Sequence, residues 1–112
     1  MKKIEAIIRP EKLEDIKDAL NKYNILGLTI SQVMGCGHQK GRTEYYRGTE
    51  VKLNLLPKIK LEIVVKDETL EEVISILTRE AKTGNVGDGK IFVYNVENAI
   101  RIRTGETGEA AI

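Results

Sequence analysis

A duplicated strand–helix unit is the feature that most constrains how this chain folds. Residues 4–20, IEAIIRPEKLEDIKDAL, align without a gap with residues 61–77, LEIVVKDETLEEVISIL. The identical pairs in this alignment are Glu5/Glu62, Glu11/Glu68, Leu13/Leu70, Glu14/Glu71 and Leu20/Leu77. Each copy opens with a β-branched-rich run typical of a strand and continues with apolar residues at helical spacing. The chain is therefore predicted to contain two copies of one supersecondary unit.

The remaining strands follow the two predicted helices. The apolar stripes of those helices are Leu13, Ile16, Leu20 and Tyr23 in the first copy and Leu70, Val73, Leu77 and Ala81 in the second. Runs at 26–33 and 90–96 alternate like strands after each helix. The order is therefore βαββαβ, the split βαβ pattern of the ferredoxin-like fold. We expect an α+β domain with a four-stranded antiparallel sheet and two helices on one face.

The length and composition indicate one soluble domain that spans residues 1–112. The chain is 41% hydrophobic and 31% charged, a balance typical of a globular protein. Two helices can cover only one face of the sheet, so Ile7 and Val64 lie on an open face beside charged residues. A half-apolar open face favours self-association, although antiparallel sheets often leave one face in water.

Charge and composition also exclude several classes of partner. A formal net charge of +1 argues against nucleic acid or an anionic membrane, and aromatic residues, at 4%, are too few for a base-stacking sheet. No apolar run approaches the ~20 residues of a membrane span, and the N-terminal apolar stretch is too short for a signal peptide. Cys36 is the only cysteine, which predicts a reducing compartment. We expect a cytoplasmic protein.

A long connection separates the two halves of the chain. It runs from about residue 36 to residue 56, whereas connections longer than about 12–15 residues are usually functional or disordered. It carries aromatic and guanidinium side chains, the types that anchor interfaces: Arg42, Tyr45, Tyr46 and Arg47. A binding loop is favoured over a purely structural flap.

The second helix is followed by a glycine-rich loop. Residues 84–90, GNVGDGK, match most of a phosphate-binding P-loop, but Ile91 replaces the hydroxyl residue and the loop follows a helix instead of a strand. A P-loop is therefore rejected. Backbone amides freed by Gly84, Gly87 and Gly89 could still form an anion nest beside Lys90, although an ordinary turn would use the same glycines.

Two further segments strengthen the anion hypothesis. Arg101 and Arg103 are predicted to share one side of an extended segment, where guanidiniums suit phosphate oxygens. The entry to the long connection, GCGHQKG, supplies further glycines. The end of the second strand and the start of the last need not touch within one subunit. The more specific hypothesis is therefore a site for nucleotide phosphates between subunits, where these segments can meet.

Motifs along nearly the whole chain resemble those of one family. YRGTE precedes LPKIKLEIVV, and TGNVGDGKIFVYNVENAIRIRTGE follows at a fixed distance. These segments are similar to the PII nitrogen-regulatory signal-transduction proteins. The resemblance implies a ligand-operated switch and not an enzyme: a homotrimer whose clefts between neighbouring subunits bind ATP or ADP competitively. It also implies that 2-oxoglutarate binds through a Mg²⁺ ion held by ATP.

The same resemblance assigns the partners. An extended T-loop, residues about 36–56, would dock on an ammonium transporter, and on nitrogen-assimilation enzymes or regulators. The membrane would be reached only through the transporter.

The resemblance also assigns site residues by position. The nucleotide site comprises Thr29, Gly35, Gly37, His38, Gln39, Glu62, Val64, Gly87, Asp88, Gly89, Lys90, Arg101 and Arg103, with the two arginines reaching across from a neighbour. The 2-oxoglutarate site comprises Gln39, Lys40, Gly41 and Lys58. The Gln39 amide oxygen would also coordinate Mg²⁺. The docking loop presents Arg42, Tyr45, Tyr46 and Arg47.

The chain departs from the family pattern at two positions. His38 stands where the family commonly has Arg, and a neutral imidazole makes a weaker phosphate contact. Val51 stands where the family has the tyrosine that is uridylylated, and valine has no hydroxyl to modify. Regulation by ligands alone is expected.

Two alternatives come from other functional classes. His38 beside Gln39 and Lys40 suggests phosphoryl transfer, but a lone loop histidine without an orienting carboxylate is a poor catalyst. Cys36 and His38 suggest a trimeric metal-binding ferredoxin-like protein, but two ligands per chain fall short of a closed site.

Overall fold

The computed structural model describes residues 1–36, 43–46, 49–52 and 55–112, with the backbone alone for 43–46 and 49–52. The strands are β1 (Lys2–Ile8), β2 (Thr29–Gly35), β3 (Thr43–Tyr46), β4 (Thr49–Lys52), β5 (Leu56–Val65) and β6 (Lys90–Asn95). The helices are α1 (Leu13–Lys22) and α2 (Leu70–Ala81), with 3₁₀ turns at Pro10–Lys12, Asp67–Thr69 and Gly108–Ala111. No helix in the described ranges is long and apolar enough to cross a membrane.

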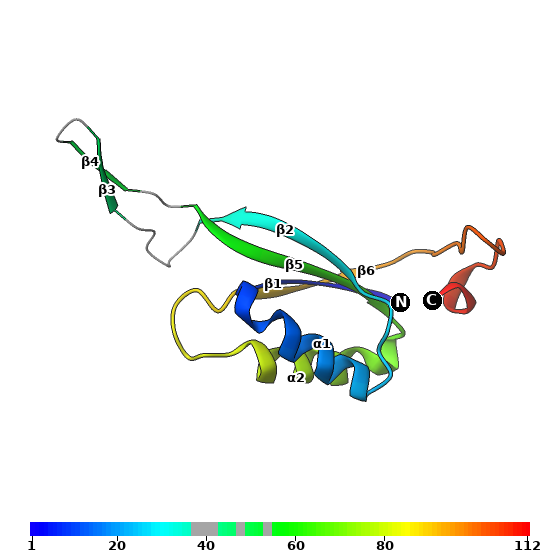
Figure 1. Cartoon of the computed structure of the whole chain (residues 1–112). Coiled ribbons are helices and arrows are strands. Elements are labelled where there is room, and N and C mark those ends of the chain that lie inside the picture. The colour runs from blue at the N-terminus through cyan, green and yellow to red at the C-terminus, as the bar shows by residue number, and fades with distance from the viewer. Residues whose placement is uncertain (37–42, 47–48, 53–54) are drawn as a thin grey trace.

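The four-stranded sheet has the order β2-β5-β1-β6 with antiparallel pairs. Both helices lie on the same face of this sheet, as Figure 1 shows. Among the residues that the structure describes, strands β3 and β4 pair with each other, in a second, two-stranded sheet within the long connection. The predicted α+β, split βαβ fold is therefore confirmed.

The core fills the space between the sheet and the two helices. Its fully buried side chains alternate along the central strands and repeat at helical spacing along the helices. They are Ile4, Ala6, Ile8, Ile59, Leu61, Ile63 and Val65 from the strands, and Ile16, Ala19, Leu20, Val73, Ile76 and Leu77 from the helices. Ile7 and Val64 alternate onto the opposite face, as predicted.

Two details differ from the sequence-based prediction. Tyr23 is 49% exposed and does not extend the buried stripe of α1. The helix ends at Lys22, and Asn24 adopts a positive φ of 59° while the Ile25 amide bonds back to the Leu20 carbonyl, so the chain turns before Tyr23 can face the core. Strand β2 accordingly begins at Thr29, later than the alternation starting at residue 26 predicts.

The C-terminal segment forms a small turn of its own. Arg101 and Arg103 were expected on an extended segment, and this was wrong. The Gly105 amide bonds to the Arg101 carbonyl over 2.7 Å, and Ile100 bridges Thr107. The positive φ of Gly105, 73°, permits the tight reversal. In Figure 1 this segment leaves the sheet at the end opposite the loop that joins α2 to β6.

Candidate functional site

Lys58 connects the two glycine-rich segments at one end of the sheet. Its ammonium donates a hydrogen bond to the Gly87 carbonyl oxygen over 2.9 Å. Its side chain also passes Gly35, where an added Cβ would lie 3.5 Å from the Lys58 Cγ. The end of β2 and the loop before β6 therefore approach each other within one subunit, which the sequence analysis did not require.

The environment of Lys58 is partly desolvated and carries charges of both signs. Burial, more than the neighbouring Arg9 guanidinium, lowers the pKa of the Lys58 ammonium. Glu11 and Asp88 act in the opposite direction. Two cations, Lys58 and Arg9, therefore lie together at this end of the sheet, and Arg9 is paired with the Asp88 carboxylate.

The glycine-rich loop adopts backbone conformations that other residues rarely reach. Gly84, Gly87 and Gly89 have φ values of 90°, 104° and 103°. At Gly89 an added Cβ would stand 1.7 Å from the Ile7 carbonyl oxygen, inside any permissible contact. The loop thus needs glycine both for its conformation and for its close approach to the central strand β1.

The carboxylate of Asp88 closes the loop from within. It accepts hydrogen bonds from the Thr83 and Gly84 amides over 2.8 and 2.9 Å, and from the Thr83 hydroxyl. Arg9 donates to the same carboxylate over 3.1 Å through Nε. The Gly84 amide, expected to face an external anion, is therefore occupied by the chain's own Asp88.

The hydrogen bonds of Asp88 also fix its charge. The Thr83 hydroxyl, followed by the two backbone amides and Arg9, holds the pKa of the Asp88 carboxyl well below its usual range, although desolvation opposes this shift. Because Asp88 is an internal anion with its own partners, any contact it makes with a phosphate would have to use its backbone amide.

Thr29, Glu62 and Val64 lie further along the same pair of strands. Thr29 faces Glu62 in the register of β2 and β5, and all three residues line a cavity of about 640 Å³. Lys3 pairs with Glu62 over 2.9 Å, and this hydrogen bond lowers the pKa of the Glu62 carboxyl. With about 3.3 Å per strand residue, Glu62 stands roughly 13 Å from Lys58. The assigned residues of β2 and β5 therefore follow one continuous strip.

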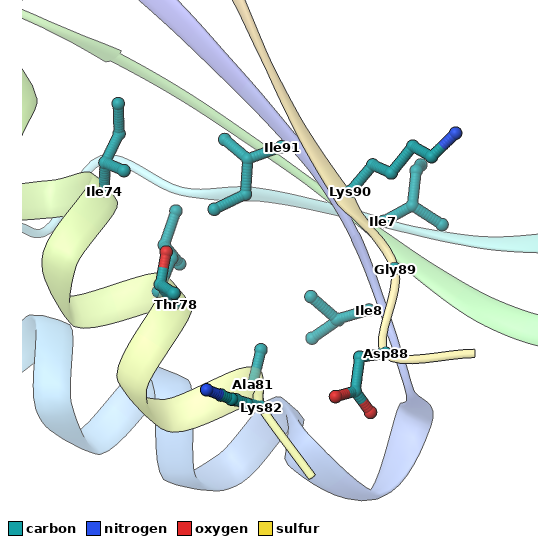
Figure 2. A pocket seen from close by; sticks show the side chains of 11 residues that line it. Ile7, Ile8, Ile74, Thr78, Ala81, Lys82, Asp88, Gly89, Lys90 and Ile91 are labelled. Atoms are coloured by element: carbon teal, nitrogen blue, oxygen red, sulfur yellow. The ribbon is translucent and has the colours of Figure 1, made fainter. Parts of the chain in front are cut away.

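Lys90 and the two C-terminal arginines occupy different places. Figure 2 shows the Lys90 ammonium pointing away from a cavity of about 360 Å³ between α2 and the sheet. Arg101 pairs with Glu106 over 3.0 Å in the C-terminal turn. The structure of a single chain does not bring Arg101 and Arg103 to the glycine-rich loop.

Other assigned residues lie outside the side chains that the structure describes. Gly37, His38, Gln39, Lys40, Gly41, Arg42 and Arg47 fall outside the described residues. Tyr45 and Val51 lie on β3 and β4, as does Tyr46, where only the backbone is described. Cys36 is exposed, and the described part of the chain holds no group of three or more His, Cys, Asp or Glu residues suited to a metal ion.

Sequence reasoning missed Arg9 and Thr83. Arg9 is the first residue after β1, and Thr83 opens the glycine-rich loop. Their signal is weak, because a Thr-Gly pair followed by an aspartate is common in turns, and only the fold brings Arg9 to it.

Comparison with known proteins decides the family. The family model described as "Nitrogen regulatory protein P-II" matches residues 1–106. The chain belongs to the P-II family. It is 56% identical to nitrogen regulatory protein P-II of Haemophilus influenzae, over all 112 residues of both chains. Over the same full length it is 55% identical to the P-II protein of Rhizobium meliloti and 53% identical to P-II 1 of Escherichia coli.

Membership of the P-II family gives the class of function. Proteins of this family are nitrogen-regulatory signalling proteins and not enzymes. The arrangement around Lys58 and the glycine-rich loop is therefore interpreted as a candidate ligand-binding site of a regulator.

Proposed function

We propose that the protein senses ATP, ADP and 2-oxoglutarate at sites between the subunits of a homotrimer. The bound ligands would control whether the T-loop docks on a target such as an ammonium transporter. Mg²⁺ held by ATP and by Gln39 would bridge to 2-oxoglutarate, and Lys58 would pair with a carboxylate of that ligand. The protein would act in the cytoplasm and meet the membrane only through the transporter.

The observation that carries this proposal is the position of Lys58. It lies at the base of the T-loop, beside Gly35, and its ammonium reaches Gly87 in the glycine-rich loop. A ligand carboxylate that paired with this ammonium would therefore act on both segments at once. A ligand shifts an equilibrium only through such differential contacts with its two states.

The charge distribution supports an anionic ligand at the same end of the sheet. Lys58 lies close enough to Arg9 for the guanidinium to lower its pKa, and Lys90 is exposed on the neighbouring strand β6. The negative charge of Asp88 is compensated by Arg9 and the loop amides, so it opposes a phosphate less than a bare carboxylate would.

The open face of the sheet supports self-association. Phe92 and Tyr94, at 44% and 47% exposure, lie on this face with Ile7 and Val64. Four of the charged side chains on this face are paired, Lys3 with Glu62 over 2.9 Å and Lys60 with Glu5 over 3.8 Å. Burying paired charges costs less than burying lone ones, so this face is suited to a subunit interface.

Calorimetry with Lys58→Met tests the ligand assignment. The wild type should bind ATP, and should bind 2-oxoglutarate only when ATP and Mg²⁺ are present. Lys58→Met should still bind ATP, more weakly because the bond to the Gly87 carbonyl is lost, and should lose most 2-oxoglutarate affinity, because a charge-assisted hydrogen bond contributes about 1.5–3 kcal/mol. An unchanged dicarboxylate affinity in the variant would remove Lys58 from the site.

A further inference from the structure

The glycine-rich loop is held by cations that reach it from outside. Arg9 forks between two acceptors: its Nε donates to the Asp88 carboxylate over 3.1 Å and its Nη2 donates to the Val86 carbonyl over 2.8 Å. Lys58 holds the next carbonyl, that of Gly87, over 2.9 Å. Consecutive peptide groups of the loop are therefore fixed by side chains from the end of β1 and from β5.

Fixing a carbonyl also fixes the amide of the same peptide group. The described chain has no cis peptide bonds, and in a trans peptide the C=O and N–H bonds point in opposite directions. Because the Val86 carbonyl faces Arg9, the Gly87 amide faces away from it. Because the Gly87 carbonyl faces Lys58, the Asp88 amide is likewise turned away. Two successive donors are thus directed to the side opposite the two cations.

Thr83 completes the arrangement from the other end of the loop. Its hydroxyl and its amide both donate to Asp88, and its hydroxyl oxygen accepts from the Asn85 amide over 3.2 Å. Asp88 is only 24% exposed and the Arg9 side chain only 14%, so these charge-assisted bonds are partly shielded from water. Figure 2 shows the Asp88 carboxylate and the Lys90 ammonium pointing in opposite directions from the chain.

We propose that Arg9 and Thr83 are positioning residues that hold the glycine-rich loop, Arg9 through the Val86 carbonyl and both through the Asp88 carboxylate, so that the Gly87 and Asp88 amides meet the phosphates of a bound nucleotide. We call the Arg9–Asp88–Thr83 set the loop clasp. The Arg9 and Thr83 side chains need not touch the ligand, because both bind the loop itself. This inference rests on the proposed nucleotide-binding function and deepens it. It also assigns Asp88 a role that its side chain performs inside the protein.

The test compares Thr83→Val, which removes the hydroxyl at nearly constant volume, with Thr83→Ser, which keeps it. Calorimetry should show ATP binding weakened about tenfold in Thr83→Val and close to wild type in Thr83→Ser, as expected for one hydrogen bond to a charged group. Arg9→Met should weaken ATP binding at least as much. Arg79→Met should have no effect, because Arg79 pairs only with the neighbouring Glu80 on the surface of α2.

Two readouts separate positioning from a general loss of structure. The weakening should be smaller for AMP than for ATP, because AMP lacks the outer phosphates, whereas partial unfolding would weaken both alike. In amide NMR spectra of the ligand-free protein, Thr83→Val should shift the signals of Gly84 and Gly87 and leave those of the core strands in place.

The outcomes are distinguishable. If the wild type binds ATP and Thr83→Val binds it equally tightly despite shifted loop amides, the positioning role is wrong and the proposed function stands. If the wild type binds no adenine nucleotide, both proposals fail, and the amide spectra then report only whether the clasp holds the loop.

Discussion

At the scale of single residues, Gly89 shows how closely the glycine-rich loop is packed on the sheet. The absence of a side chain lets the loop backbone contact the Ile7 carbonyl, and the positive φ of 103° would strain any other residue. Glycine is required here for two independent reasons, the positive φ and the lack of space for a Cβ. The atoms in the way belong to the backbone, so no flexible side chain can move to make room.

Gly89→Ala should therefore destabilise the fold by more than about 2 kcal/mol, because it combines backbone strain with a clash against backbone atoms. Chemical denaturation measures this change. Gly27→Ala is the matched control, since an added Cβ at Gly27 meets nothing within 4 Å. Its stability should stay within about 0.5 kcal/mol of wild type. Equal stabilities for the two variants would mean that the loop does not approach β1 in solution.

The lowered pKa of the Asp88 carboxyl predicts that the stability of the protein depends on pH. This pKa is lower in the folded than in the unfolded chain, chiefly because of the Thr83 hydroxyl. The unfolded state therefore binds a proton first as the pH falls, and the contribution of Asp88 is full above the ordinary carboxyl pKa of about 4 and declines below it. In urea unfolding, the free energies of unfolding of wild type and Asp88→Asn should differ most near pH 7 and progressively less below pH 4. A difference in unfolding free energy that stays constant down to pH 3 would contradict this assignment.

At the scale of elements, the duplicated pattern was sufficient to predict the helices and the sheet, because burial on one face imposes the same spacing in both copies. The structure keeps this symmetry even where the sequences differ. A 3₁₀ turn precedes each helix, at Pro10–Lys12 and at Asp67–Thr69, although the copies have Pro10 and Asp67 at the same position.

The boundary of β2 was predicted less well. Alternation reports which way side chains point and not whether the backbone is paired. Leu28 packs against the core although it precedes the first paired residue, Thr29, and Leu26 is 71% exposed. The turn at Asn24 determines where pairing begins, and a positive φ at a non-glycine residue leaves little trace in a hydrophobic pattern.

The candidate site was predictable only in part, for a similar reason. The glycines at 84, 87 and 89 indicate a backbone conformation that other residues rarely adopt, and in the structure all three have positive φ values. The contact between Arg9 and Asp88 joins residues 79 positions apart, and it depends on where β1 ends relative to the loop. Such a contact follows from the fold as a whole and has no local signature.

At the scale of the whole molecule, the open face of the sheet is the surface through which we propose that subunits associate. Phe92 and Val93 are neighbours on the edge strand β6 and are equally exposed, at 44% each, but they alternate onto opposite faces. Phe92 pairs with Glu5 on the open face, and Val93 pairs with Ile4 on the helix-covered face. The pair offers a matched test of which face is buried between subunits.

Phe92→Lys should break the proposed trimer into smaller species, because an unpaired charge would replace an aromatic ring in the buried interface. Val93→Lys should leave the assembly intact. Light scattering on the purified proteins measures the change, and the wild type should have the mass of three chains. A monomeric wild type, or equal dissociation by both variants, would show that the open face is not the interface.

The bond between Lys58 and the Gly87 carbonyl links two parts of the chain that are 29 positions apart. One ammonium group therefore belongs both to the base of the long connection and to the glycine-rich loop. A dicarboxylate that paired with Lys58 would change how this ammonium holds the Gly87 carbonyl, and a nucleotide that reshaped the loop would change how readily Lys58 met the dicarboxylate. Thermodynamic reciprocity then requires the influence to be equal in both directions.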